Sequence, residues 1–178
     1  AISASLAAVG IGTETDGSII CPSSVSGLVG LKPTVGLVSR SGIIPISVSQ
    51  DTAGPMTRTV TDAAMLLTVM AGVDADDPHG QEAAGKVAAD YTTFLKADAL
   101  KGKRFGLLRQ AMGYHPEVDA STLKAVEAIK AAGGEVIDVK VPTYNAWGDA
   151  EFDVLLYEFK DGLNAYLKKA GAAQSSLE

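Results

Sequence analysis

The sequence predicts an α/β fold, and three stretches of the 178-residue chain support this class. Residues 104–141 show a strand pattern, a helix pattern and a second strand pattern, which is typical of a βαβ unit. Residues 63–71 are apolar on nearly every side, as in a buried helix. Residues 151–169 carry apolar side chains at helical spacing. A βαβ unit favours parallel strands joined by a right-handed crossover.

The first third of the chain is expected to begin inside a helix. Residues 1–8 are alanine-rich and have neither a capping residue nor a preceding turn, as expected of a helix entered partway along. Residues 30–33 predict a strand that ends at its proline. Residues 174–178 in turn lead towards another element, so we expect the chain to be truncated at both ends.

The middle of the chain carries a helix start signal. Thr59 followed three residues later by Asp62 resembles a capping box, which predicts that the buried helix of residues 63–71 begins there. Residues 74–85 are acidic and rich in helix breakers, so they are expected to form a surface connection. A short helix is expected within residues 90–100.

The second half supplies the βαβ unit and a long helix. Residues 104–109 are the first predicted strand, and residues 120–132 are a helix that stops at a Gly-Gly pair. In the second strand, residues 137–141, apolar residues alternate with charged ones. The long helix carries an apolar stripe that is expected to pack in a core or interface rather than line a pocket. This stripe comprises Phe152, Leu155, Leu156, Phe159, Leu163, Tyr166 and Leu167.

A glycine-containing turn near the N-terminus carries a candidate nucleophile, Ser18. Gly17 permits backbone angles that side chains disfavour. If the backbone of Thr15, Asp16, Gly17 and Ser18 curves, its N–H groups converge on one point and form a nest for an anion or a developing oxyanion. Ser18 would then lie beside its own oxyanion hole.

Local spacing alone leaves this turn unidentified. No Gly-Lys-Ser/Thr follows, which argues against a phosphate-binding P-loop, and the dinucleotide fingerprint lacks its third glycine. The G-x-S-x-G elbow of many serine hydrolases is absent around Ser18. A glycine turn with a serine is more often structural than catalytic, so the residues alone indicate only a candidate oxyanion site.

Four blocks between Gly10 and Pro78 resemble the amidase signature family of Ser-cisSer-Lys amidohydrolases. They read GIGTETDGSI, CPSSVSGLVGLKPT, GLVSRSGIIPISVSQDTAGPMTRTVTDAAMLL and AGVDADDP, in that order. The resemblance implies that Ser18 is the acyl-enzyme nucleophile, that the backbone of residues 15–18 forms the oxyanion hole, and that no cofactor or metal takes part. It also implies an incomplete α/β domain with a mixed sheet flanked by helices.

The family's other two catalytic residues are a lysine and a second serine in a Gly-Ser-Ser-Gly-Gly-like loop upstream of these blocks, and neither has a counterpart here. A serine without an adjacent base is a weak nucleophile, so the isolated chain is expected to be nearly inert. Lys32 is expected to make a structural contact rather than replace the base. Asp51 and Arg58 match recurrent family positions and are expected to support the structure, and their pairing is a hypothesis.

Two residues depart from the most familiar family pattern. Asp16 stands where those members have glycine, and Ile20 where they have arginine. Because the oxyanion hole uses backbone N–H groups and aspartate accepts unusual backbone angles better than most residues, the hole is expected to persist. The Thr-Asp-Gly-Ser-Ile form resembles stand-alone amidases of the peptide-amidase type more than the glutaminase of a tRNA-dependent amidotransferase.

Composition limits the partners and the compartment. A net charge of −6 argues against a nucleic-acid or anionic-membrane surface, and no apolar run reaches the roughly 18 residues of a membrane span. The single Cys21 excludes an internal disulfide and is expected to be buried. His79 and His115 lack the flanking ligands of a zinc site and are expected at the surface or in loops. The expected partner is a small-molecule or peptide amide, and the expected location is the cytoplasm.

We expect one partial domain, with a signature core that carries the nucleophile turn in residues 1–78 and a βαβ and helical scaffold in residues 79–178. The resemblance favours an amidohydrolase that cleaves a carboxamide through a seryl acyl-enzyme. Two alternatives stay open: the glutaminase subunit of a tRNA-dependent amidotransferase, and a non-catalytic module that retains the scaffold. A lysine and a Gly-Ser-Ser-Gly-like loop in the upstream coding sequence would favour catalysis.

Overall fold

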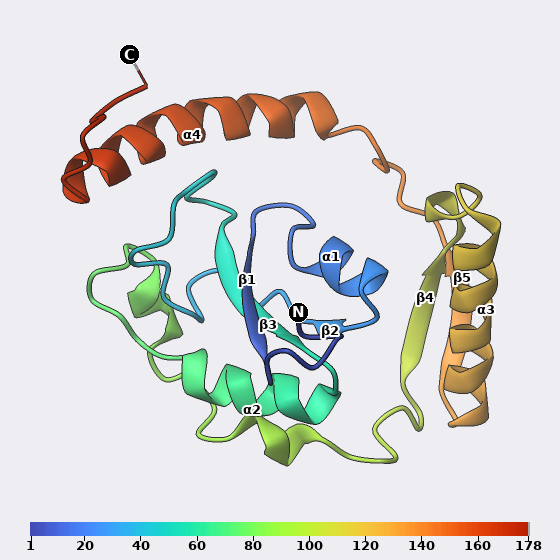
Figure 1. Ribbon diagram of the computed structural model, residues 1–178. Coiled ribbons are helices and arrows are strands. Elements are labelled where there is room, and N and C mark those ends of the chain that lie inside the picture. The colour runs from blue at the N-terminus through green and yellow to red at the C-terminus, as the bar shows by residue number, and fades with distance from the viewer. Residues whose placement is uncertain (178) are drawn as a thin grey trace. The chain divides into compact units, whose positions relative to one another are not determined.

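The computed structural model describes residues 1–177, which form two compact units (Figure 1). The first unit contains residues 1–94 together with the chain from residue 151 onward, and the second contains residues 95–150. Each unit combines strands with helices, which confirms the predicted α/β class.

A three-stranded antiparallel sheet in the order β1-β3-β2 lies in the first unit. Strand β1 spans Gly10–Glu14, β2 spans Val29–Gly30 and β3 spans Thr52–Thr57. The β1–β3 ladder ends where Glu14 lies opposite Thr52. Strand β3 is buried along nearly its whole length because both of its edges are paired and α2 covers it.

The central strand β3 accommodates residues that usually weaken strands, Gly54 and Pro55. Gly54 is required by a close approach: a Cβ at this position would lie 2.1 Å from the carbonyl oxygen of Leu31 and 2.8 Å from Cδ of Pro33. The segment that follows β2 therefore packs directly on the backbone of β3.

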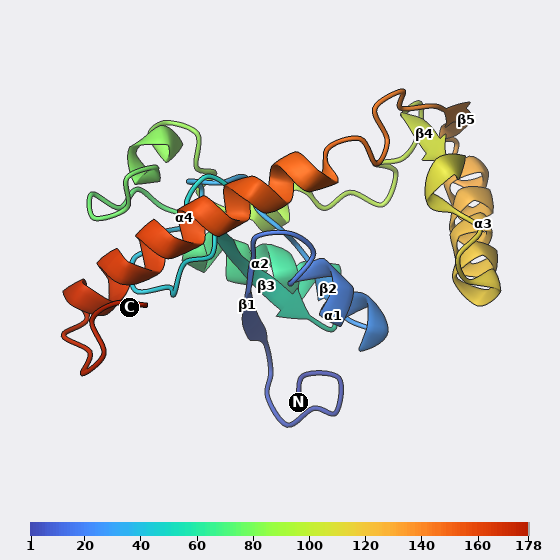
Figure 2. The same ribbon diagram turned by 90° about the horizontal axis from the view of Figure 1, so that it is seen from above.

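Helix α2, Val60–Met70, lies beside β3 in both views of the chain (Figures 1 and 2). Thr59 is its N-cap, with an extended backbone and a side chain that accepts a hydrogen bond of 3.0 Å from the N–H of Asp62. This confirms the start predicted from the capping box. Ala63 and Leu67, one turn apart, bury the face that meets the sheet.

The remaining helices of the first unit are α1, α4 from residue 151 onward, and two short 3₁₀ turns. Helix α1 spans Ile20–Val25, α4 spans Gly148–Lys169, and the 3₁₀ turns η1 and η2 span Gly80–Ala83 and Tyr91–Phe94. The apolar stripe of α4 is only partly covered: Phe159 and Leu163 are half-buried, whereas Phe152 is exposed. Among residues 1–177, no helix has the length and apolar character needed to cross a bilayer.

The second unit contains the predicted βαβ motif. Strand β4, Arg104–Leu108, runs parallel to β5, Glu135–Val139, and helix α3, Pro116–Ala131, joins them after the 3₁₀ turn η3, Arg109–Ala111. Figures 1 and 2 show α3 alongside the two strands. Gly133, at φ 85°, reverses the chain after α3, a conformation that favours glycine.

Two N-terminal predictions differ from the structure. Residues 1–8 form turns rather than a helix, and Ser5 has a φ of 58°, which a right-handed helix excludes. So short a segment gains little stability from helix formation, whereas the guanidinium of Arg58 donates to two of its carbonyl oxygens. The strand predicted for residues 30–33 is shorter, because β2 ends at Gly30.

Replacing Gly54 by alanine should destabilise the protein by about 1–3 kcal/mol, because the new Cβ would overlap the backbone of Leu31. Urea unfolding measures this loss. Gly72→Ala is the matched control, since nothing lies within 4 Å of a Cβ there, and it should change the unfolding free energy by less than about 0.5 kcal/mol. Equal effects of the two substitutions would contradict the packing of this segment on β3.

Candidate active site

Ser18 lies in a turn between the end of β1 and the start of α1, and its side chain is exposed. Gly17 has a φ of 83°, in the left-handed region that favours glycine, and a Cβ there would lie 3.1 Å from the sulfur of Cys21. The sharp turn predicted from Gly17 is therefore present. Thr15 and Gly17 are half-buried, whereas Asp16 is exposed.

A buried carboxylate, that of Glu14, holds the end of this turn that leads into α1. Its Oε2 accepts hydrogen bonds from the backbone N–H groups of Ile19, at 2.7 Å, and Ile20, at 2.9 Å. Only 6% of Glu14 is exposed, so its charge acts close to these amides. The first N–H groups of a helix have no partner within the helix, and Glu14 supplies one.

The hydrogen bonds of Glu14 determine its protonation. Burial raises the pKa of its carboxyl, but the N–H groups of Ile20, Ile19 and Gly17, together with the charge of Lys32, outweigh burial and hold the pKa below its ordinary value. Glu14 is therefore ionised at neutral pH. The ionised form is the one that accepts these hydrogen bonds most strongly.

A second carboxylate, that of Asp51, holds the other end of the turn. The hydroxyl of Thr15 donates to Oδ1 of Asp51, and the N–H groups of Ile46 and Ser47 each donate to Oδ2 at 2.9 Å. Thr15 and Asp51 come directly after and before the last paired residues of β1 and β3, so they oppose each other just beyond the ladder. The Ser18 turn is thus fastened on both sides by buried carboxylates.

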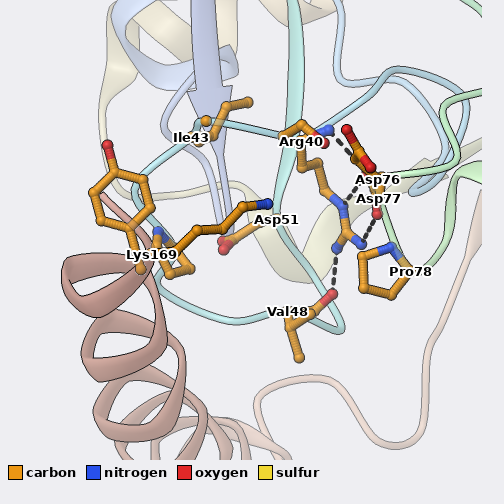
Figure 3. Close-up of a pocket in the computed structure, with 12 residues that line it drawn as sticks. Arg40, Ile43, Val48, Asp51, Asp76, Asp77, Pro78 and Lys169 are labelled. Atoms are coloured by element: carbon orange, nitrogen blue, oxygen red, sulfur yellow. Dashed lines mark hydrogen bonds and ion pairs between the residues drawn. The ribbon is translucent and has the colours of Figure 1, made fainter. Parts of the chain in front are cut away.

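An ion pair between Arg40 and Asp77 lies close to Asp51 (Figure 3). The Arg40 guanidinium donates from Nη2 to Oδ1 of Asp77 at 2.5 Å and from Nε to Oδ2 at 2.9 Å, and its Nη1 donates to the carbonyl of Val48. The two side chains are 8% and 1% exposed. The hydrogen bond from Arg40 holds the pKa of the Asp77 carboxyl well below its usual range, although burial opposes this.

A pocket of about 170 Å³ opens beside this ion pair, lined by Arg40, Asp51, Asp77 and Lys169 among others (Figure 3). Ser18 is not among the residues that line it. The guanidinium of Arg40 is already paired with Asp77 and the Val48 carbonyl. The pocket is therefore distinct from the exposed turn that carries the candidate nucleophile.

A family model described as "Amidase" matches residues 1–178, the whole chain. This chain belongs to the amidase signature family. The match confirms the family predicted from the four sequence blocks.

Similar proteins include stand-alone amidases and one component of an amidotransferase. A probable amidase of Arabidopsis thaliana is 40% identical over 94% of this chain and 33% of its own length. A glutamyl-tRNA(Gln) amidotransferase subunit of Thermosynechococcus vestitus is 37% identical over 97% of this chain and 37% of its own length. The native peptide amidase from Stenotrophomonas maltophilia superposes with a TM-score of 0.90 and 50% identity over 99% of this chain and 36% of its own.

The chain thus spans about one third of the length of the amidase relatives that it matches. Within residues 1–177, the side chain of Ser18 makes no hydrogen bond, and the exposed Lys32 acts on Glu14 through its charge. The described part of this chain therefore brings the Ser18 turn together with carboxylates that hold it. It does not bring a base to Ser18.

The pairing of Asp51 with Arg58, a hypothesis from the sequence, does not occur among residues 1–177. Asp51 bonds to Thr15 and to the backbone, whereas Nη1 of Arg58 donates to the carbonyls of Ile2, at 2.8 Å, and Ala7, at 3.1 Å. Asp51 therefore holds the backbone of the loop before β3, and Arg58 holds the backbone of the N-terminal segment. Arg58 holds the segment that leads into β1.

The remaining expectations for single residues concern Cys21, His79 and His115. Cys21 is exposed rather than buried as predicted, because the N-cap Ile19 and Ser23, one turn apart, form the inward face at the start of α1, and Cys21 lies between them on another face. His79 is half-buried and its Nδ1 lies 2.6 Å from Oε1 of Glu82, and His115 is exposed. No metal-binding cluster of His, Cys, Asp or Glu side chains occurs among residues 1–177.

The role of Glu14 was not predicted from the sequence, in which the glycines and Ser18 are the more conspicuous residues of this turn. The signal was an acidic residue placed after a short apolar run and a few residues before a helix, where it can accept from the first N–H groups of that helix.

Replacing Glu14 by glutamine should destabilise the protein by about 1–2 kcal/mol, because a charge-assisted acceptor for two backbone N–H groups becomes a neutral one. Urea unfolding at neutral pH measures the change. As a control, Glu127→Gln removes an exposed α3 carboxylate paired with Lys130 and should cost less than about 0.5 kcal/mol. A loss no larger than that of the control would contradict the role assigned to Glu14.

Asp77 should make folding sensitive to acid. Its pKa is lower in the folded protein than the ordinary value of 3.8, so its ionised form stabilises the fold above that value, and this stabilisation is lost as the pH falls below it. Asp77→Asn should lower the unfolding free energy at pH 7 by about 3 kcal/mol and flatten its decline between pH 5 and pH 2. Urea unfolding across this range that gave parallel pH profiles for both proteins would contradict this assignment.

Proposed function

We propose that this chain is the nucleophile-bearing part of an amidase that hydrolyses a carboxamide through an acyl-enzyme on Ser18. The observation that supports this most strongly is the Ser18 turn itself, an exposed serine after a left-handed Gly17, in a chain that belongs to the amidase family. The partial domain that we propose spans residues 1–178, about one third of the length of similar amidases.

In the proposed reaction, Oγ of Ser18 attacks the amide carbonyl carbon and the carbonyl oxygen becomes an oxyanion. Backbone N–H groups of residues 15–18 stabilise that oxyanion. Among residues 1–177, the N–H groups of Asp16 and Ser18 have no protein acceptor, which leaves them free to donate. Ammonia or an amine leaves with a proton, and water then attacks the seryl ester to release the acid and restore Ser18.

Deprotonation of Ser18 is the step that this chain does not supply. A serine hydroxyl without an adjacent base is a weak nucleophile. The family resemblance assigns this proton transfer to a lysine and a second serine upstream of the matched blocks. We therefore propose that residues 1–178 alone are close to inactive and that a fluorophosphonate labels Ser18 slowly in the isolated chain.

A stand-alone amidase is favoured over a component of an amidotransferase. The chain is 50% identical to a peptide amidase over 99% of its length, compared with 37% identity over 97% to the amidotransferase protein of Thermosynechococcus vestitus. A carboxamide of the peptide-amide class is accordingly the proposed substrate. Glutamine hydrolysis that depends on a partner protein would instead support the amidotransferase alternative.

Ser18→Ala in the full-length protein that carries this chain should reduce kcat/KM for a peptide amide by roughly 10³-fold or more, because the acyl-enzyme can no longer form. Ammonia release measures the rate. Ser24→Ala, at an exposed position of α1, is the matched control and should retain activity within about twofold.

Comparable activity of Ser18→Ala and the wild type would refute the nucleophile assignment. A wild-type protein that neither releases ammonia nor reacts with a fluorophosphonate would favour the non-catalytic module. The upstream coding sequence provides an independent check, since an active amidase should carry the lysine and the Gly-Ser-Ser-Gly-like loop there.

A further inference from the structure

A chain of hydrogen bonds connects helix α4 to the Ser18 turn. It begins at Glu158, whose Oε2 accepts from the hydroxyl of Ser47 at 2.5 Å and from the N–H and hydroxyl of Ser49 at 3.0 and 2.9 Å. Ser47 is completely buried, so its hydroxyl depends on a protein acceptor. Glu158 thereby anchors the loop of residues 46–51 to α4.

The loop of residues 46–51 is itself closed by Asp51. Oδ2 of Asp51 accepts from the N–H groups of Ile46 and Ser47, and the carbonyl of Ser47 accepts from the N–H groups of Gln50, at 3.0 Å, and Asp51, at 2.8 Å. The start of the loop thus donates to the side chain at its end, and the end of the loop donates to a carbonyl near its start. They leave Oδ1 of Asp51 directed at the hydroxyl of Thr15.

We propose that Asp51, Ser47 and Glu158 are positioning residues for the oxyanion hole and act through the side chain of Thr15. The proposal rests on the proposed function of the Ser18 turn. Thr15 is the first residue of that turn, and its hydroxyl is held by an ionisable carboxylate that is 7% exposed. A β-branched side chain has few χ1 options, so fixing its hydroxyl also restricts the backbone that carries it.

Oxyanion donors work only when they are correctly placed. A displacement of about 1 Å at a reacting group costs on the order of 10²-fold in rate, and donors must lie within about 0.5 Å of their productive positions. Glu14 fastens the α1 side of the turn, but within residues 1–177 its side chain makes no hydrogen bond to Thr15. The orientation of the turn on the β1 side therefore depends on Asp51 and on what holds Asp51.

The electrostatics of Glu158 agree with this arrangement. Burial raises the pKa of its carboxyl, but hydrogen bonds from Ser47 and Ser49 outweigh burial and hold the pKa below its ordinary value. Glu158 is therefore a charged acceptor at neutral pH, and the bonds it accepts are of the stronger, charge-assisted kind.

The test uses the full-length protein and the variant Thr15→Val, which replaces the hydroxyl by a methyl group of similar shape. The substitution should lower kcat for a peptide amide about tenfold and leave KM within about twofold, because the oxyanion exists only after attack. A substrate-like peptide aldehyde, which forms an oxyanion on reaction with serine, should bind about tenfold more weakly, whereas the corresponding alcohol should bind unchanged. Thr15→Ser restores the hydroxyl and should recover most of the lost kcat.

Glu158→Gln tests the far end of the chain of hydrogen bonds and should lower kcat about threefold with the same selective loss of aldehyde affinity. Its matched control is Asp153→Asn, which removes an exposed carboxylate from the same helix and should change neither quantity. If Thr15→Val fails to fold, the comparison of Glu158→Gln with Asp153→Asn decides the proposal by the same measurements.

The possible failures are distinguishable. A wild-type protein that forms no acyl-enzyme overturns the proposed function and this inference together. An active wild type with unchanged kcat and aldehyde affinity in Thr15→Val, or in Glu158→Gln if Thr15→Val does not fold, overturns the inference alone. Equal losses of aldehyde and alcohol affinity would show general damage to the fold, and would also overturn it.

Discussion

The buried carboxylate of Glu14 links the end of strand β1 to the start of helix α1. Glu14 is the last paired residue of β1, opposite Thr52, and its side chain accepts hydrogen bonds from the N–H groups of Ile19 and Ile20. A charged group at 6% exposure is stable only if its hydrogen-bonding capacity is used, and the backbone of the following turn uses it. The left-handed Gly17 and the exposed Ser18 both lie within the segment that Glu14 closes.

Buried carboxylates also fix the loops around the turn elsewhere in the first unit. Asp51 lies opposite Thr15 just beyond the end of the β1–β3 ladder, so the pairing of these two strands is enough to bring the two side chains together. Arg40 and Asp77 add a second buried pair close to Asp51. Buried ionic groups of this kind contribute little net stability, but breaking one is costly, so they specify one arrangement of the loops around the turn.

Sequence patterns predicted local elements well where a single local signal, such as residue periodicity or a capping residue, was strong. The βαβ unit followed from alternating residues in β5, from the helical spacing of α3 and from the glycine pair between them, and Thr59 marked the start of α2. Strand β3 was missed because Gly54 and Pro55 have low strand propensity, and only the close approach of Leu31 explains the glycine. Cys21 was misassigned because the buried face of a six-residue helix depends on its packing.

The carboxylates that hold the Ser18 turn could not be predicted from local patterns either, since Thr15 and Asp51 are far apart in the sequence and meet only through strand pairing.

Rapid acid quenching tests most directly whether the turn held by Glu14 and Asp51 presents Ser18 as a nucleophile. The full-length protein is quenched during turnover of an activated substrate, and its proteolytic peptides are analysed by mass spectrometry. The account predicts that the peptide containing Ser18 gains the mass of the acyl group and that this adduct disappears when the substrate is exhausted. Steady hydrolysis with the acyl group on another residue, or with Ser18 unmodified throughout, would contradict it.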